Sequence, residues 1–77
     1  MDKDTRDLDI QRLANRIRML REQMGYSNYE KFAFEKDIPR AQYWRYEKGE
    51  DLKFSSLMKV IRALEMTPEQ FFGEGFD

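Results

Sequence analysis

The sequence predicts an all-α domain of five consecutive helices joined by short turns. Three observations support this prediction. Apolar residues recur at intervals of three and four through most of the chain, which is the period of an amphipathic helix. Glycine, proline and threonine residues stand where those stretches stop or start. No segment alternates polar and apolar residues with the period of two that a half-buried strand requires.

The first predicted helix follows an apolar stripe and ends at a glycine. The stripe consists of Ile10, Leu13, Ile17, Leu20 and Met24. Arg12, Arg16 and Arg18 lie mostly off this stripe. Gly25 then supplies the left-handed conformation that commonly terminates a helix. Before the stripe, residues 1–9 form a charged segment that we expect to be partly flexible.

The second predicted helix is short. It begins after Ser27, which with Glu30 makes a capping box, or after Asn28, which is also a preferred capping residue. Its inward face carries Tyr29, Phe32 and Ala33. Asp37, a residue type that tolerates positive φ, ends this helix after about nine residues.

Proline and glycine delimit the third predicted helix. Pro39 suits the first turn of a helix and no later position, because it fixes φ and lacks a donor. Gly49 ends the helix, which we therefore place at residues 39–48.

The last two helices follow a short linker. The fourth carries apolar residues at helical spacing, namely Leu57, Val60, Ile61 and Leu64. Thr67 is the predicted N-cap of the fifth, with Pro68 at its first position and Gln70 placed to reach back to the Thr67 amide. Met66 and Phe71 are spaced to pack together as a hydrophobic staple.

The composition excludes several classes of function. With 77 residues, 40% of them hydrophobic, the chain is long enough for one domain with its own core. It contains no cysteine and no histidine, which removes disulfides, thiol and imidazole catalysis and the usual zinc ligands. We therefore expect no enzyme activity, no metal site and no cofactor. The chain has neither a signal peptide nor an apolar run of membrane-spanning length, so we expect a cytoplasmic protein without a membrane partner.

Positive charge is concentrated in the middle of the chain. The formal net charge is −1, but residues 10–62 carry 12 basic and 7 acidic side chains. The flanking segments, residues 1–9 and 63–77, are both net acidic. A basic centre favours nucleic acid as a partner, because lysine and arginine neutralise phosphates.

Several pieces of the chain, in their order and spacing, carry a resemblance to a known family. These are RIRMLRE followed by MGYS, the small Ala33, the segment IPRAQYWRYEKG, and the segment LMKVIRALEMTPEQFF. The stretch from Arg16 to Phe72 thus resembles the Cro and phage-repressor helix-turn-helix family, also called XRE-like regulators. The resemblance implies a compact five-helix bundle of the lambda-repressor-like DNA-binding type. Residues 10–72 would form this domain and residues 73–77 a C-terminal tail.

The resemblance also implies roles for individual positions. Relatives often pair an arginine of the first helix with the glutamate before the glycine that ends the third, which here are Arg21 and Glu47. Ala33 would lie where the second and third helices cross closely. A larger side chain at this position would push the two helices apart. Asp37 and Glu65 stand where the family usually or commonly has glycine.

A helical wheel of the third predicted helix separates a basic face from a tyrosine face. At about 100° per residue, one arc holds Arg40, Ala41, Trp44, Arg45 and Lys48. Tyr43 and Tyr46 lie on the remaining arc and are the predicted core residues.

The basic arc supplies the candidate base-reading residues. Arg40 and Arg45 suit this role, because the planar arginine side chain donates two hydrogen bonds to guanine O6 and N7 in the major groove. Relatives read bases from the first turns of this helix, so the resemblance adds Ala41 as an apolar contact to a thymine methyl group. The alternative is an ordinary solvated, charged face.

Contacts to the DNA backbone are expected from four residues. Lys48 and Lys53 are candidates by charge, and the amide groups near Asn28 and Tyr29 by their place at a helix N-terminus. Relatives often have a DNA-contacting glutamine there, which Tyr29 or Asn28 replaces. Trp44 has three interpretations: a stack on Arg40, a cover at the rim of the DNA interface, or a protein-binding patch.

The sequence therefore predicts sequence-specific binding of duplex DNA by a transcriptional regulator of bacterial or phage type, with residues 39–48 in the major groove. We expect a homodimer on DNA, because one such helix buries too little surface for the usual specific affinity. Phe71, Phe72 and Phe76 belong either to the core or to a dimer contact. The alternative function is a protein-binding module, such as an antitoxin or the partner of a regulator, which uses the same fold. The mild net charge and Trp44 favour it.

Overall fold

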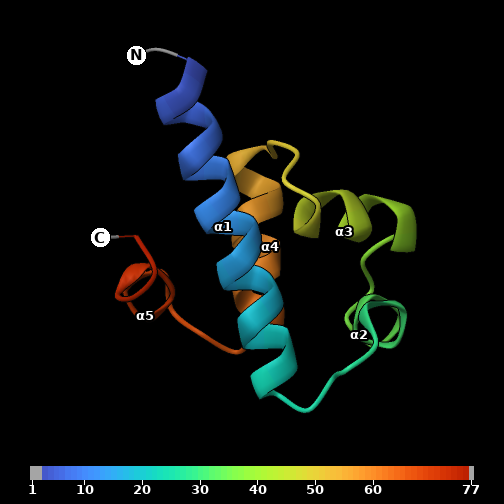
Figure 1. The fold of residues 1–77 in the computed structure, drawn as a ribbon. Helices are drawn as coiled ribbons and strands as arrows, with labels where there is room; N and C mark the ends of the chain where they lie inside the picture. The colour runs from blue at the N-terminus through green and yellow to red at the C-terminus, as the bar shows by residue number, and fades with distance from the viewer. Residues whose placement is uncertain (1–2, 77) are drawn as a thin grey trace.

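A computed structural model describes residues 3–76 of the chain, with side-chain surroundings from residue 8 onward. Within this range it contains five helices and no strand: α1 (Lys3–Gln23), α2 (Tyr29–Glu35), α3 (Arg40–Glu47), α4 (Phe54–Ala63) and α5 (Pro68–Phe72). The all-α prediction with five helices is confirmed. Figure 1 shows α1 crossing in front of α4, with the α2–α3 pair on one side of them and α5 on the other. None of the helices in the described range is both long and apolar enough to cross a membrane.

A single core joins all five helices. Its buried residues are Ile17, Leu20, Phe32, Ala33, Ile38, Tyr43, Tyr46, Val60, Ile61, Leu64 and Phe71. The prediction that Tyr43 and Tyr46 face inward is confirmed. The rings of Phe32 and Tyr43 lie 5.1 Å apart between centroids, so an aromatic contact joins α2 to α3.

Helix α1 begins earlier than the apolar stripe indicated. It starts at Lys3, so most of the segment over residues 1–9 is helical rather than separate from the first helix. Once the packed part of a helix has formed, each further residue adds a hydrogen bond at little extra cost. A charged extension without an apolar stripe can therefore continue the helix.

The α2–α3 unit is set by local backbone chemistry. The Asn28 side chain accepts hydrogen bonds from the amides of Glu30 and Lys31, so Asn28 is the N-cap and the capping box from Ser27 is wrong. Helix α2 is also shorter than expected, with seven residues. Asp37 adopts φ 59° at the turn, as predicted. Directly after it, the Ile38 amide donates to the Ala33 carbonyl over 2.9 Å.

The turn between α4 and α5 combines one strained residue with one strong cap. Glu65 adopts φ 59°, in the left-handed region where glycine is at ease. The predicted Thr67 capping box is present: the Thr67 amide donates to Gln70 over 3.0 Å, and the Gln70 amide donates to the Thr67 hydroxyl over 3.2 Å. Of the three C-terminal phenylalanines, Phe71 is fully buried, Phe76 packs against the core, and Phe72 stays half-exposed.

Candidate nucleic-acid interface

Helix α3 presents a basic face to solvent. Its inward tyrosines anchor it in the core, and the opposite arc consists of residues that are all exposed: Arg40, Ala41, Trp44, Arg45 and Lys48. Three of these five carry a positive charge, and the arc itself contains no carboxylate. The structure thus brings together the candidate base-reading residues and one candidate backbone contact on one face of α3.

Arg40, the first residue of α3, is already engaged in an ion pair. Its Nη1 lies 2.8 Å from Oε2 of Glu30 in the first turn of α2. The side chains of Arg40 and Glu30 are 69% and 46% exposed. Solvent screens such a pair strongly, so the contact orients the guanidinium but adds little to folding stability.

Arg45 and Ala41 lie on the same face without such a restraint. The Arg45 side chain takes part in no hydrogen bond or ion pair with the described part of the chain. None of its five N–H donors has a partner among the described residues. Ala41 is exposed and offers only a methyl group, which suits an apolar contact.

Trp44 contacts Lys48, so the stack on Arg40, one of its three interpretations, is wrong. The Lys48 ammonium group lies 5.5 Å from the centroid of the Trp44 ring, whereas Arg40 pairs with Glu30. Lys48 follows Trp44 by four residues, and the negative face of an indole ring attracts a cation. Trp44 remains 42% exposed, so one part of the ring still faces solvent.

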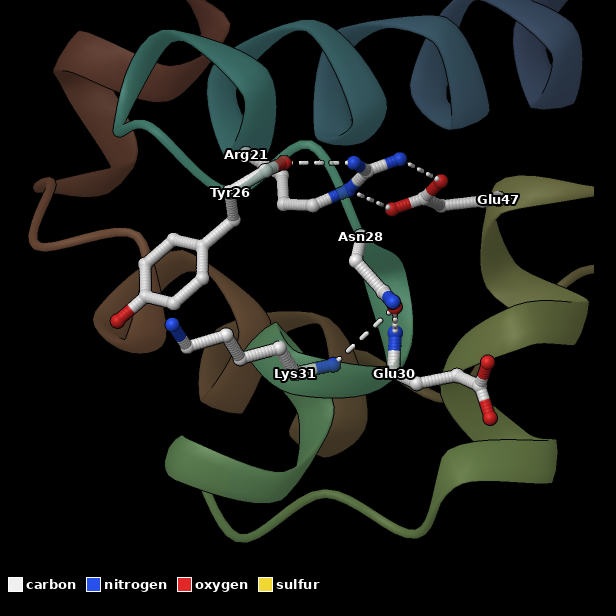
Figure 2. A network of polar contacts seen from close by, with 6 residues as sticks. All are labelled: Arg21, Tyr26, Asn28, Glu30, Lys31 and Glu47. Carbon is white, nitrogen blue, oxygen red and sulfur yellow. Dashed lines mark hydrogen bonds and ion pairs between the residues drawn. The ribbon is translucent and has the colours of Figure 1, made fainter.

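The start of α2 offers fewer free donors than its sequence indicated. Asn28 Oδ1 accepts from the Glu30 amide over 2.7 Å and from the Lys31 amide over 3.4 Å, as Figure 2 shows. Two amides of the first turn therefore already have a partner. Tyr29 is half-buried and packs against the core. Lys53 is exposed as the N-cap residue of α4 and stands outside the α3 face.

An inner ion pair fixes the far end of α3 to α1. Arg21 donates from Nε and Nη2 to the two carboxylate oxygens of Glu47, over 2.9 and 2.8 Å, and from Nη1 to the Tyr26 carbonyl over 2.7 Å (Figure 2). Both charged side chains are nearly buried. The hydrogen bonds that Arg21 donates to Glu47 raise the pKa of Arg21, although burial opposes this shift. The predicted pair is thus present, and it sets the orientation of α3.

Two charged residues have contacts that the sequence reasoning missed. Arg16 was placed mostly off the apolar stripe, but its side chain is buried. Its Nε donates to the Phe71 carbonyl over 2.9 Å, and its Nη2 donates to the Gln70 carbonyl over 3.1 Å. Leu13 and Leu20 lie three positions before it and four after it, so helical spacing already placed Arg16 beside the stripe. Glu30 is the second of these residues. Its carboxylate accepts a hydrogen bond from Arg40 and does not reach back to Ser27.

Comparison with known families gave a match. A family model described as helix-turn-helix matches residues 17–71, which include the last third of α1, all of α2, α3 and α4, and most of α5. Comparisons with curated proteins and with solved structures gave no match.

Proposed function

The chain belongs to the XRE-like helix-turn-helix family of DNA-binding regulatory domains, and from this premise we propose that it is a transcriptional regulator that reads duplex DNA with α3. The observation that carries the proposal is the exposed arc of α3, with its three cations and its opposite face of buried tyrosines. A helix held in this way can enter the major groove of B-DNA, which is about 12 Å wide.

The proposed readers of base identity are Arg40, Ala41 and Arg45. Each arginine suits guanine, because its planar donors match the O6 and N7 acceptors of that base. Ala41 suits a thymine methyl group at a neighbouring base pair. Arg45 supports this assignment most strongly, because none of the described side chains occupies its donors.

The proposed backbone contacts come from Lys48 and Lys53, with the amide of Tyr29 beside the Asn28 cap as a further donor. Phosphate contacts position a protein on DNA and carry most of its non-specific affinity. Arg16 and Arg21 do not take part, because both are buried in contacts within the protein. Fewer basic residues are therefore available for DNA contacts than the charge count of residues 10–62 indicated.

We propose that two copies bind one DNA site. A single recognition helix of this length buries little surface, and helix-turn-helix dimers reach half-sites about one helical turn apart. Footprinting on the preferred site checks this. Protection of two half-sites about 10 base pairs apart supports a dimer, and protection of one isolated half-site contradicts it.

A protein-binding module is the second candidate function, and the exposed aromatic side chains favour it. Phe34 on α2 is 84% exposed and Trp44 on α3 remains partly exposed. The Glu30 carboxylate also neutralises part of the charge at the start of α3. In this case the same surface would receive a protein partner.

Selection from a random pool of duplex DNA at near-physiological salt separates the two candidates. Enrichment of a common sequence supports DNA reading, and its loss in an Arg40→Ala, Arg45→Ala double variant assigns the reading to α3. Recovery of an unenriched pool contradicts the proposal and favours the protein-binding module. Circular dichroism of the parent and the variant establishes that both remain helical.

A further inference from the structure

We propose that Glu30 determines specificity: its carboxylate holds Arg40 for base reading and keeps this arginine from acting as a general phosphate contact. This inference rests on the proposed function, because it assigns a positioning residue to the same DNA-reading face. Glu30 itself lies on α2, outside the basic face of α3.

The ion pair joins two points of well-defined backbone. Glu30 lies in the first turn of α2, where its amide donates to the Asn28 side chain over 2.7 Å. Arg40 follows Pro39, whose ring fixes φ, observed at −54°. Figure 2 shows the Glu30 side chain extending from the Asn28 cap toward the ribbon of α3. Two side chains ten residues apart thus meet over 2.8 Å because the turn between α2 and α3 brings both helix starts together.

The remaining donors of Arg40 are sufficient to read a base. Glu30 accepts from Nη1 only, and neither Nη2 nor Nε of Arg40 has a partner among the described residues. A guanidinium has five N–H donors, and a bidentate contact to guanine uses two of them. Arg40 can therefore keep its contact with Glu30 while it binds a base.

The same carboxylate disfavours the competing use of Arg40. A free arginine at this exposed position would bind phosphates of any DNA sequence with equal ease. Glu30 restrains the guanidinium and adds a negative charge near the protein–DNA boundary, which repels the phosphate backbone. Both effects lower affinity for unrelated DNA more than affinity for a site with guanine opposite Arg40.

Glu30→Gln tests this inference, with Glu35→Gln as the matched control. Glu35 lies at the other end of α2, is exposed, and has no ion pair within the described residues. Binding is measured for the preferred duplex, for single-mismatch duplexes and for unrelated DNA. Because an exposed ion pair is worth up to about a fivefold change in an equilibrium, we expect Glu30→Gln to lower the preference at one base position by roughly two- to fivefold. Its affinity for unrelated DNA should rise, and Glu35→Gln should keep the parental preference.

The Arg40→Ala background shows whether Glu30 acts through Arg40. There, Glu30→Gln should leave base preference unchanged, because no guanidinium remains to be positioned. An effect of equal size with and without Arg40 overturns the inference, as does parental preference in the Glu30→Gln single variant. In both cases the proposed function stands if the parent discriminates between duplexes. A parent that binds all duplexes alike contradicts the proposed function itself and this inference with it.

Discussion

Loss of Arg21 should strongly destabilise the scaffold that holds α3. Arg21→Met keeps much of the side-chain volume but removes all three hydrogen bonds of the guanidinium, two to Glu47 and one to the Tyr26 carbonyl. The Glu47 carboxylate would then remain nearly buried without its cation. An unpaired charge in such a place costs far more free energy than the intact pair contributes.

The magnitude follows from burial. Removing one partner of a buried ion pair costs about 3–5 kcal/mol, and a domain of this length has a total stability of about 4–12 kcal/mol. The free energy of unfolding should therefore fall by a large fraction. For a domain of 60–100 residues, each kcal/mol corresponds to about 4–8 °C in melting temperature, so we expect a decrease of at least about 12 °C.

Urea denaturation of Arg21→Met and of Arg21→Met, Glu47→Leu measures this effect. Replacing both charges with apolar groups leaves no buried carboxylate, so the double variant should recover most of the lost stability. If Arg21→Met loses less than about 1 kcal/mol, or if the double variant is less stable than the single one, the buried pair does not fix α3 in the way described.

Three further changes test the packing and the turns. Ala33→Leu should lower the free energy of unfolding by about 1–3 kcal/mol, because Ala33 is fully buried where α2 meets α3; an unchanged melting temperature would contradict this close crossing. Tyr43→Phe should be neutral or stabilising by about 1 kcal/mol, because the buried Tyr43 hydroxyl has no hydrogen-bond partner in the described structure. Burial, followed by Glu47, raises the pKa of Tyr43 above its ordinary value of 10.0. The folded parent thus keeps a proton on Tyr43 that the unfolded chain loses above pH 10. Its free energy of unfolding should therefore fall by about 1.4 kcal/mol per pH unit above pH 10. In denaturant titrations, the difference in stability between the parent and Tyr43→Phe should grow with pH. Glu65→Gly should stabilise the fold by up to about 1 kcal/mol, since φ is 59° at that position; a lower melting temperature would show that the Glu65 side chain compensates for the strain.

The turn at Asp37 and the cap at Thr67 were predicted correctly, because local chemistry decides both. Asp37 at positive φ and the reciprocal bonds of Thr67 and Gln70 each depend on residues within one turn. The start of α1 could not be found in this way, since residues 3–9 continue the helix without an apolar stripe. Periodicity predicts a helix only where one face is apolar.

The candidate site was harder to predict, because its contacts join residues that are distant in sequence. The outer arc of α3 followed from the helical wheel alone. The pairing of Glu30 with Arg40 required the α2–α3 turn geometry, and the burial of Arg16 required the position of α5. A long cationic side chain at the edge of an apolar stripe can be either buried or exposed, and the position of the neighbouring helix decides which.

Base discrimination by Arg45→Ala, with Lys48→Ala as its counterpart, tests the central claim most directly. The measurement is equilibrium binding to the preferred duplex and to every single-mismatch duplex across a salt series. Arg45→Ala should weaken binding to the preferred site by about 1–3 kcal/mol and abolish the preference at one base position. Lys48→Ala should weaken binding to all duplexes nearly alike and reduce the salt slope by about one, because one fewer counterion is released. If folded Arg45→Ala keeps the affinity and the base preference of the parent, the outer face of α3 does not read DNA through Arg45, and the account of this surface as a recognition helix is contradicted.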